Sequence, residues 1–346
     1  MGLTSAQVLA VDSGGSGLRV ALAPAHGDGP TLTWSSPEPV PVGDRGIDAR
    51  ALLDRVLPAA RELLRQAGAD GCAAVCVGAA GMVTLGDDLR AVLPGALSAE
   101  VGAPRLALAS DAVTAYAGAL GQRPGAVIAA GTGLVALGTD LVPGGGWRRS
   151  DGWGHLLGDS GGGAWIGRAG LEAALRAYDG RAGGSAALLA RLEAVFGPAP
   201  DLPGALYPRP DRAAVLASFA PEVGRCAAAC PVAAGILRSA ARHIAGAAAA
   251  VCRPPEQGGP SARTPAVALT GGLAGIGDPL LLPLRQELRK QLPHARPVAA
   301  AGTPLDGASR IAAALVTDRL LLPVDGALLR VTTGTPSTAP PGHTLR

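Results

Sequence analysis

Aromatic side chains are scarce in this sequence. Phe, Trp and Tyr make up only 3% of its 346 residues, although 48% of the residues are hydrophobic. The core must therefore be built mainly from Ala, Val and Leu. Gly and Pro are frequent, at 51 and 30 residues, and they are spread along the whole chain. That distribution predicts a folded protein with many tight turns and argues against a low-complexity, disordered chain.

The sequence also lacks a dense run of Lys and Arg. Its net charge is only +3, and a nucleic-acid-binding protein normally shows a basic stripe, so we expect no nucleic-acid partner. No segment reaches the roughly 18 apolar residues of a membrane-spanning helix; the longest apolar run, residues 244–252, is mostly Ala and predicts a buried helix. With no charged and apolar leader at the N-terminus, we expect a cytoplasmic protein without a membrane partner.

Cysteine is rare as well, with five residues. An odd number in a chain of this length predicts reduced thiols rather than a disulfide framework. Cys72/Cys76 and Cys226/Cys230 share a Cys-x₃-Cys spacing, which is a loose signal for a metal site. We expect the first pair to flank a buried strand and the second to lie one turn apart on an Ala-rich helix, where thiols behave as small hydrophobic groups.

The predicted secondary structure repeats in two halves. Each half opens with a strand, a Gly-rich turn and a second strand, at residues 8–23 and again at 126–138. Residues 48–68 show the spacing of an amphipathic helix that ends at Gly68, and residues 167–253 predict several helices. The pattern predicts the α/β class, with two related domains and a cleft between them, and 346 residues suffice for two domains.

The expected domain boundaries follow from this repeat. Residues 1–118, with a returning helix in 308–325, are expected to form the first domain, and residues 119–307 the second. Residues 331–346 are rich in Thr, Pro and Gly and are expected to be disordered.

Three Gly-rich loops each follow an apolar strand. They are Asp12-Ser13-Gly14-Gly15-Ser16-Gly17, Gly131-Thr132-Gly133 and Thr270-Gly271-Gly272. Backbone N–H groups in such loops can approach a phosphate closely, and Asp12 could hold Mg²⁺ through water. Each loop alone also fits an ordinary tight turn or a helix start. As a set they predict a nucleotide site, and neither GxxxxGK[ST] nor a GxGxxG before a helix is present.

Asp111 stands where an apolar strand ends and a predicted helix begins. An acidic residue at this point commonly caps the helix. It can also act as a general base that orients a hydroxyl group and accepts its proton during phosphate transfer. Both interpretations stay open, and one residue can serve both roles.

Residues 152–168 form the most unusual segment of the chain. They contain two of the four tryptophans and seven glycines. Trp153 could lie against the face of a sugar ring while Asp159 accepts its hydroxyl groups. Alternatively, Trp153 anchors the loop to the core and Asp159 caps the helix that follows. We expect His155 to form local hydrogen bonds rather than to catalyse, because no second His or Cys lies nearby in the sequence.

Together these motifs resemble the N-acetylglucosamine kinase branch of the BadF/BadG/BcrA/BcrD-type ATPase family, within the sugar kinase and actin superfamily. The likeness covers about residues 8–322. Residues 12–19 resemble the first phosphate motif of the family, 131–133 the second, 270–272 the adenosine motif, and 304–308 the return into the final helix. The Gly-Trp-Gly…Gly-Asp-x-Gly loop is the most specific match. The resemblance implies two actin-like (ribonuclease H-like) ATPase domains with an interdomain cleft.

The resemblance also implies a role for each matched residue. Asp111 would be the catalytic base. ATP would be bound by Asp12, Gly14, Gly15, Ser16, Arg19, Gly131, Thr132, Gly271 and Gly272, with Mg²⁺ at Asp12. The sugar would contact Thr132, Gly133, Gly152, Trp153, Asp159 and Gly163. The implied reaction transfers the γ-phosphate of ATP to the 6-hydroxyl of N-acetylglucosamine or a closely related hexosamine, in a homodimer.

Two departures from the family pattern leave the sugar open. The loop reads Gly-Asp-Ser-Gly-Gly where the family more often has Gly-Asp-Glu-Gly-Ser, and the family's sugar-binding Asn has no clear match in residues 37–45. Glucosamine and N-acetylmuramic acid are therefore alternatives. An iron–sulfur dehydratase activator, suggested by the Cys pairs, and a regulatory ATPase without kinase chemistry are alternatives of other classes. The activators lack the Gly-Trp-Gly loop, and the presence of Asp12 and Asp111 argues against an inactive site.

Overall fold

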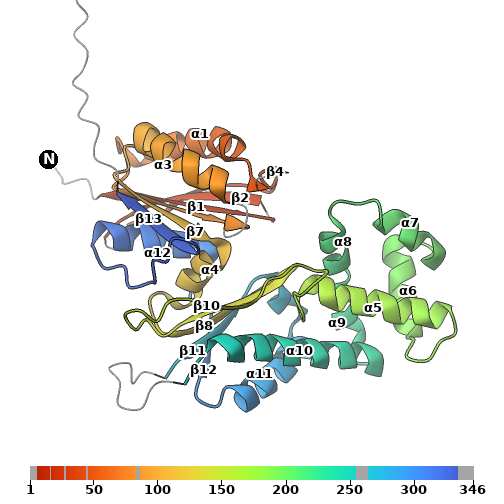
Figure 1. Cartoon of the computed structure of the whole chain (residues 1–346). Coiled ribbons are helices and arrows are strands. Elements are labelled where there is room, and N and C mark those ends of the chain that lie inside the picture. The colour runs from red at the N-terminus through yellow and green to blue at the C-terminus, as the bar shows by residue number, and fades with distance from the viewer. Residues whose placement is uncertain are drawn as a thin grey trace, which may run out of the picture. The chain divides into compact units, whose positions relative to one another are not determined.

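The computed structural model describes residues 6–15, 17–26, 29–43, 46–82, 86–254 and 264–333. Ser16, an expected nucleotide ligand, and residues 334–346 of the expected tail lie outside this part. The chain divides into two compact units, which we call unit 1 (Met1–Gly121 with Gly302–Arg346) and unit 2 (Gln122–Ala301). The expected domain boundaries at 118/119 and 307/308 stay predictions. Each unit contains helices and a mixed β-sheet (Figure 1), so the predicted α/β class is confirmed.

Unit 1 is built on a six-stranded sheet with the order β13-β7-β6-β1-β2-β3. The strands are β1 (Gln7–Gly14), β2 (Gly17–Pro24), β3 (Leu32–Ser36), β6 (Ala74–Ala79), β7 (Arg105–Ser110) and β13 (Leu329–Thr333). The neighbours β1, β6 and β7 run parallel, and the remaining pairs are antiparallel. A separate ribbon joins β4 (Val42–Gly43) to β5 (Gly46–Ile47). Because β1 and β6 are buried along nearly their whole length, both faces of the sheet must be covered.

Two helix pairs supply that cover (Figure 1). Helices α1 (Ala49–Ala67) and α3 (Asp87–Val101) pack on one face, where Leu9 and Val11 of β1 meet the leucines of both helices. The N-cap of α1 is Asp48, whose side chain accepts hydrogen bonds from two backbone N–H groups, and its C-cap is Gly68, with a positive φ of 63°. The helix predicted over 48–68 is therefore confirmed, and it ends at glycine because that residue adopts the left-handed conformation without strain.

Helices α4 (Asp111–Leu120) and α12 (Pro304–Val316) cover the other face and meet backbone to backbone. A Cβ atom at Gly307 would overlap the backbone oxygen of Thr114. Arg310 of α12 donates to the carbonyls of Ala117 and Gly118, at 3.0 and 2.6 Å. This contact fixes α4, whose first residue is Asp111. The final helix predicted from 308 begins at Pro304 instead, because Thr303 and Asp306 form a capping box.

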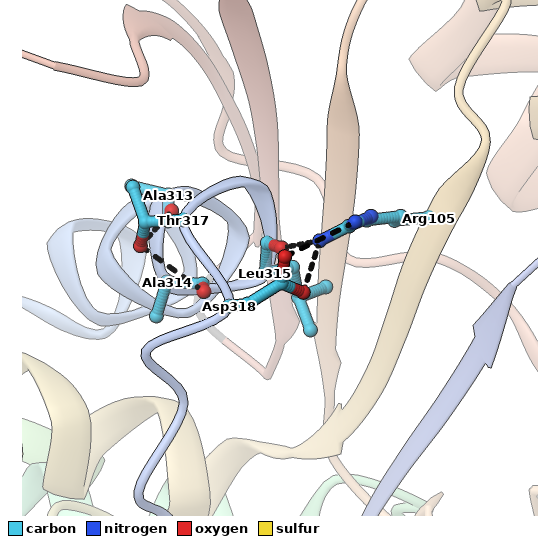
Figure 2. Close-up of polar contacts among 6 residues, drawn as sticks. All are labelled: Arg105, Ala313, Ala314, Leu315, Thr317 and Asp318. Carbon is cyan, nitrogen blue, oxygen red and sulfur yellow. Dashed lines mark hydrogen bonds and ion pairs between the residues drawn. The ribbon is translucent and has the colours of Figure 1, made fainter.

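The C-terminal end of α12 is held by side chains of unit 1 (Figure 2). Arg105, at the start of β7, donates to the carbonyl of Leu315 and to Asp318, whose Oδ1 lies 2.6 Å from Nη1. Thr317 Oγ1 donates to the carbonyls of Ala313 and Ala314, at 3.2 and 3.3 Å. These side chains add to the backbone hydrogen bonds that the same carbonyls accept from Thr317, Asp318 and Arg319 at the end of the helix.

Strand β13 corrects the expected tail. Val331, Thr332 and Thr333 pair with β7 and are not disordered. The reason is a long-range one: β7 offers an edge with open hydrogen-bonding groups, and β-branched residues suit a strand beside it.

Unit 2 contains a five-stranded sheet with the order β10-β9-β8-β11-β12. The strands are β8 (Gly125–Ala130), β9 (Leu134–Thr139), β10 (Arg148–Asp151), β11 (Ala266–Thr270) and β12 (Arg296–Ala299). Strands β8, β11 and β12 run parallel, whereas β9 and β10 are antiparallel to their neighbours. The strand–turn–strand unit predicted at 126–138 is therefore confirmed as β8 and β9.

The helical segment predicted over 167–253 is also confirmed. It forms α5 (Gly163–Tyr178), α6 (Ala186–Phe196), α7 (Leu202–Leu206), α8 (Arg212–Ser218), α9 (Ala220–Cys226) and α10 (Pro231–Val251), with the short η1 (Ala199–Asp201). After β11 come η2 (Gly272–Ile276) and α11 (Asp278–Gln291), and α11 lies beside α10 (Figure 1). Within the described ranges no single helix is long and apolar enough to cross a membrane; one pair bent by 119°, residues 212–226 with 231–251, passes by length and composition.

The cysteines are free thiols. Burial raises the pKa of the Cys72 thiol to about 12 and also raises that of Cys76, which lies within β6. Cys226 and Cys230 do not share one helix, so that prediction is wrong. Cys226 ends α9 and Cys230 caps α10, because Pro231 disfavours helical backbone at the residue before it. In the part of the chain that the structure describes, no three His, Cys, Asp or Glu residues are grouped to hold a metal ion.

Two glycine substitutions test the contact between α4 and α12. Gly307→Ala should lower the free energy of unfolding by about 3 kcal/mol, because the new methyl group overpacks a backbone contact. Gly95→Ala, in α3, meets no atom within 4 Å and should raise that free energy by about 0.5–1 kcal/mol through helix propensity. Chemical denaturation of both variants measures the difference. A Gly307→Ala variant as stable as the original protein would contradict the close contact.

Candidate functional site

The carboxyl ends of three parallel strands meet at one edge of the sheet in unit 1. Ser13 of β1 pairs with Ala79 of β6, which pairs in turn with Ser110 of β7. The turn at Gly14 and Gly15 and the start of α4 therefore lie along the same edge. In open α/β sheets, such edges are where ligands bind.

Asp12 is the buried acidic group of this edge, with only 7% of its surface exposed. It faces Arg19 across the β1–β2 pair, and its Oδ2 accepts a hydrogen bond of 3.1 Å from Nη1 of Arg19. Burial raises the pKa of Asp12, and Arg19 partly opposes that shift. A carboxylate held this way gains from a further cation beside it, because a nearby positive charge favours the ionised form.

A cavity of about 220 Å³ opens within unit 1 at the turn that follows β1. It is lined by Ser13, Gly14, Gly15, Pro39, Val40, Gly46, Ile47, Ala80 and Gly81. No atom lies within 4 Å of a Cβ built on Gly14 or Gly15, so the backbone of this turn is open to a ligand. The cavity is smaller than the roughly 300 Å³ of most ligand pockets, and it suits a phosphate group better than a whole nucleotide.

Asp111 lies at the same edge as the first residue of α4, and its side chain is exposed. The helix cap is Ser110, whose Oγ accepts a 3.3 Å hydrogen bond from the N–H of Val113. The interpretation of Asp111 as the cap is therefore wrong, because the cap is the residue before it. Its carboxylate sits at a helix N-terminus, which favours negative charge, and accepts a hydrogen bond from the N–H of Ala112.

In unit 2, the second and third Gly-rich loops lie side by side. Strands β8 and β11 run parallel, and Thr270, the last residue of β11, pairs with Ala129 of β8. A Cβ atom at Gly271 would overlap the carbonyl oxygen of Ala130. Gly271 therefore allows the backbone of the two loops to touch.

The segment that contains Gly-Trp-Gly is hydrogen-bonded to the loop Gly131-Thr132-Gly133. The N–H groups of Gly163 and Ala164, at the start of α5, donate to the carbonyls of Gly131 and Thr132, at 2.9 and 2.8 Å. A Cβ atom at Gly163 would lie 2.7 Å from the carbonyl oxygen of Gly131. The expected phosphate loop and the expected sugar loop thus form one backbone unit.

Asp159 is buried between these two joined loops, with 8% of its surface exposed. Burial is the main cause that raises its pKa, and the negative charge of Asp151 adds to the shift, whereas N–H groups such as that of Gly154 lower it. The alternative role of Asp159 as a helix cap is wrong, because the cap residue of α5 is Gly162. A Cβ atom at Gly133 would overlap Oδ2 of Asp159, so these two residues are in direct contact.

Asp151, at the end of β10, was not singled out from the sequence. Its carboxylate accepts hydrogen bonds from the backbone N–H groups of Gly152 (2.8 Å), Asp159 (2.6 Å) and Ser160 (3.0 Å). These bonds tie both ends of the loop together. The available signal was an Asp directly before a Gly-rich turn, a position where Asp side chains often accept local N–H groups.

Trp153 does not anchor the loop to the core, so that alternative is wrong. Its side chain is 69% exposed, and the neighbouring Leu156 and Leu157 are 79% and 87% exposed. Trp165 packs inward instead, edge to face against His243 with ring centres 5.1 Å apart. The guanidinium carbon of Arg149 lies 5.3 Å from the centre of the Trp153 ring. A large aromatic ring is thus presented at the surface, and the next residue, Gly154, donates its N–H to the buried carboxyl group of Asp159 at 3.2 Å.

The expected site residues fall into two sets. Asp12, Gly14, Gly15, Arg19 and Asp111 belong to unit 1, and Thr132, Gly133, Gly152, Trp153, Asp159 and Gly163 belong to unit 2 together with Gly131, Gly271 and Gly272. Within each unit the structure brings the members of the set close together. Their roles stay predictions.

Comparison with known proteins identifies the family of this chain. The profile of the BadF/BadG/BcrA/BcrD ATPase family matches residues 9–312. A curated N-acetylmuramic acid/N-acetylglucosamine kinase of Clostridium acetobutylicum is 33% identical over 110 residues, which are 32% of this chain and 35% of that protein. The sequence match therefore spans about a third of the length of that relative.

Two crystal structures of candidate N-acetylglucosamine kinases resemble most of the chain. The protein from Chromobacterium violaceum is 27% identical with a TM-score of 0.66, and the match covers 89% of this chain and 99% of that protein. The protein from Porphyromonas gingivalis is 19% identical with a TM-score of 0.62, covering 88% and 97%. The predicted two-domain fold of the actin-like sugar kinases and the predicted family are both confirmed.

Asp151→Asn tests the closure of the loop at its base. The amide has one acceptor oxygen where the carboxylate has two, so a backbone N–H is left without a partner, which should lower the free energy of unfolding by about 1–3 kcal/mol. Amide hydrogen exchange at Asp159 and Ser160 should speed up. Asp179→Asn, which alters an exposed ion pair of the same unit, should change the stability by less than about 0.5 kcal/mol. Equal exchange rates in both variants would show that Asp151 does not hold the loop.

Proposed function

The chain belongs to the BadF/BadG/BcrA/BcrD ATPase family, and on this basis we propose that it is an ATP-dependent kinase of hexosamines. One contact carries the proposal. The loop that holds Trp153 and the buried Asp159 is hydrogen-bonded, backbone to backbone, to Gly131 and Thr132 of a phosphate-type loop. An amphipathic ring site and an anion site are thus joined in one rigid element, as transfer of phosphate to a sugar requires.

The nucleotide is assigned to the Gly-rich loops. Gly14 and Gly15 expose their backbone to a cavity of about 220 Å³ in unit 1, and Arg19 on β2 is a further proposed ligand. The further ATP ligands that we propose are Asp12, Ser16, Gly131, Thr132, Gly271 and Gly272. Open backbone N–H groups suit the phosphate chain, and glycine lets a ribose and base approach the main chain.

Asp12 is the proposed Mg²⁺ residue. The donor set fits that ion, because Mg²⁺ is commonly held by one or two carboxylates together with phosphate oxygens and water, rather than by a cage of protein ligands. When bound, Mg²⁺ neutralises charge that develops on the transferring phosphate. Asp12 is buried and paired only with Arg19 among the described residues, and a cation would lower the cost of keeping it ionised.

The sugar is assigned to unit 2. The exposed ring of Trp153 offers an apolar face, and the Asp159 carboxyl group offers acceptors for sugar hydroxyls. Burial raises the pKa of Asp159, so its ionised form gains from hydroxyl donors. Thr132, Gly133, Gly152 and Gly163 complete the proposed sugar contacts.

Asp111 is the proposed general base. Its carboxylate would accept the proton of the 6-hydroxyl group while that oxygen forms a bond to the γ-phosphorus and the bond to the β-phosphate oxygen breaks, with ADP as the leaving group. The exposure of Asp111, at a helix N-terminus, keeps this carboxylate accessible to a hydroxyl group.

The substrate that we propose is N-acetylglucosamine or a closely related hexosamine. The named activities of the Clostridium acetobutylicum relative make N-acetylmuramic acid the second candidate, and glucosamine is a third. The homodimer and the cytoplasmic location stay predictions. An iron–sulfur activator would need thiolate ligands. Burial raises the pKa of Cys72 and Cys76 and so disfavours the thiolate form of both residues.

A panel of hexosamines with coupled detection of ADP tests the function. Purified protein with ATP and Mg²⁺ should form ADP rapidly with N-acetylglucosamine or a related amino sugar, and slowly without one. Hydrolysis of ATP at a rate independent of every sugar would favour the regulatory ATPase. Brown colour with cluster absorbance would favour the dehydratase activator.

Asp111→Asn tests the general base. The amide cannot accept the proton, so kcat should fall by about 10²–10⁴-fold while KM for the sugar changes little. Asp87→Asn is the matched control, because Asp87 is the first residue of α3 in the same unit and is also exposed; it should keep full activity. An Asp111→Asn enzyme with undiminished kcat on its best sugar would refute the assigned role.

Gly133→Ala and Gly131→Ala separate the two halves of the proposed site. A methyl group at Gly133 would displace the Asp159 carboxyl group and should raise KM for the sugar by about tenfold, a loss of about 1.4 kcal/mol. A methyl group at Gly131 meets no protein atom within 4 Å and should raise KM for ATP instead. Steady-state kinetics with each substrate varied in turn measures both constants. The same change in both variants would contradict the division.

A further inference from the structure

We propose that Arg149 is a positioning residue that presents one face of Trp153 to the sugar ring. Arg149 lies on β10, four residues before Trp153 in the chain. This role rests on the proposed function, because we take the ligand that stacks on Trp153 to be the ring of the hexosamine.

The side chain of Arg149 binds backbone carbonyls at the start of the loop. Nε donates to the carbonyl of Asp151 at 3.1 Å, and Nη2 donates to the carbonyl of Gly152 at 2.5 Å. The rigid fork of the guanidinium thereby grips two successive carbonyls. The same group lies over the Trp153 ring, with its carbon 5.3 Å from the ring centre, at a distance typical of a cation–π contact.

Two glycines leave the space for this arrangement. Gly152 has a φ of 78°, and a Cβ atom there would lie 2.9 Å from Nη2 of Arg149. A Cβ atom at Gly158 would lie 2.9 Å from Cβ of Trp153 and 3.2 Å from its Cδ1. The base of Trp153 is therefore confined by the Gly158 backbone, and one ring face is covered by Arg149.

The consequence is a tryptophan that is exposed but not free to turn. Its side chain is 69% exposed, so most of the ring is open to a ligand. Because the guanidinium occupies one face, a sugar must stack on the opposite face. Arg149 thus sets the orientation of the plate before the sugar arrives, which lowers the entropy lost on binding.

A purely structural role for Arg149 would act differently. The Arg149 side chain is exposed, and among the described residues it forms no ion pair. Its removal leaves no buried charge without a partner, so stability should change little. The effect of substitution should be confined to the sugar and should depend on Trp153.

Arg149→Met is the first test. KM for the best hexosamine should rise about tenfold, while kcat and KM for ATP change by less than about twofold. Arg149→Lys, which keeps the cation but cannot grip both carbonyls, should give an intermediate KM. Arg289→Met, an exposed Arg of α11 in the same unit, is the control and should behave as the original enzyme. An unchanged sugar KM in Arg149→Met would overturn the proposal.

A double-mutant cycle with Trp153→Ala tests whether Arg149 acts through Trp153. If it does, adding Arg149→Met to Trp153→Ala should raise the sugar KM no further. A second tenfold rise in the double variant would show that Arg149 acts on the sugar or the loop by another route, and would overturn the positioning role.

Fluorescence of the sugar-free protein separates this proposal from the proposed function. The emission of Trp153 is obtained as the difference between each protein and its Trp153→Phe counterpart. Arg149→Met should make that emission more accessible to quenching by acrylamide, and Arg289→Met should not. Absence of phosphorylation with every hexosamine would overturn the kinase function alone, whereas unchanged quenching would overturn the positioning of Trp153 by Arg149.

Discussion

Direct contact between main-chain atoms holds the candidate site in shape. In unit 1, Gly307 of α12 meets the backbone of α4 and so fixes the helix that begins with Asp111. In unit 2, the start of α5 is hydrogen-bonded to the carbonyls of Gly131 and Thr132, and Gly271 lies against Ala130. A chain with few aromatic residues has few large side chains with which to fill gaps. Its elements instead approach until backbone meets backbone, and this gives loops a fixed geometry without bulky packing.

The buried acidic groups depend on that geometry. Asp12 and Asp159 each have a pKa raised by burial, a shift that Arg19 opposes at Asp12 and that the N–H groups of Gly154 and Leu134 oppose at Asp159. Asp151 differs, because three backbone N–H groups share its carboxylate. The first two are the residues that we propose to receive ligands, whereas Asp151 holds the loop. The number of hydrogen-bond donors around each Asp side chain therefore distinguishes these residues.

Local patterns in the sequence predicted much of the fold and the positions of the Gly-rich loops. Strand ends and the boundaries of α1 follow from periodicity and from Asp48 and Gly68, which act on their immediate neighbours. The predictions that were wrong concern contacts between distant segments, or a position that differs by one residue. The pairing of β13 with β7 joins segments far apart in sequence, and a shift of one residue decided that Ser110 rather than Asp111 caps α4. The exposure of Trp153 and the role of Asp151 required the path of the loop itself, which no periodicity encodes.

The backbone contacts around the loop also limit how this protein can diversify. Gly152, Gly158 and Gly163 each face atoms that leave no room for a side chain, and Asp151 is fully engaged, so substitution at any of them disturbs the frame. The side chains of Leu156 and Leu157, by contrast, are 79% and 87% exposed. We therefore expect altered substrate ranges, whether selected in nature or in a library, to arise at these two positions while the frame stays constant.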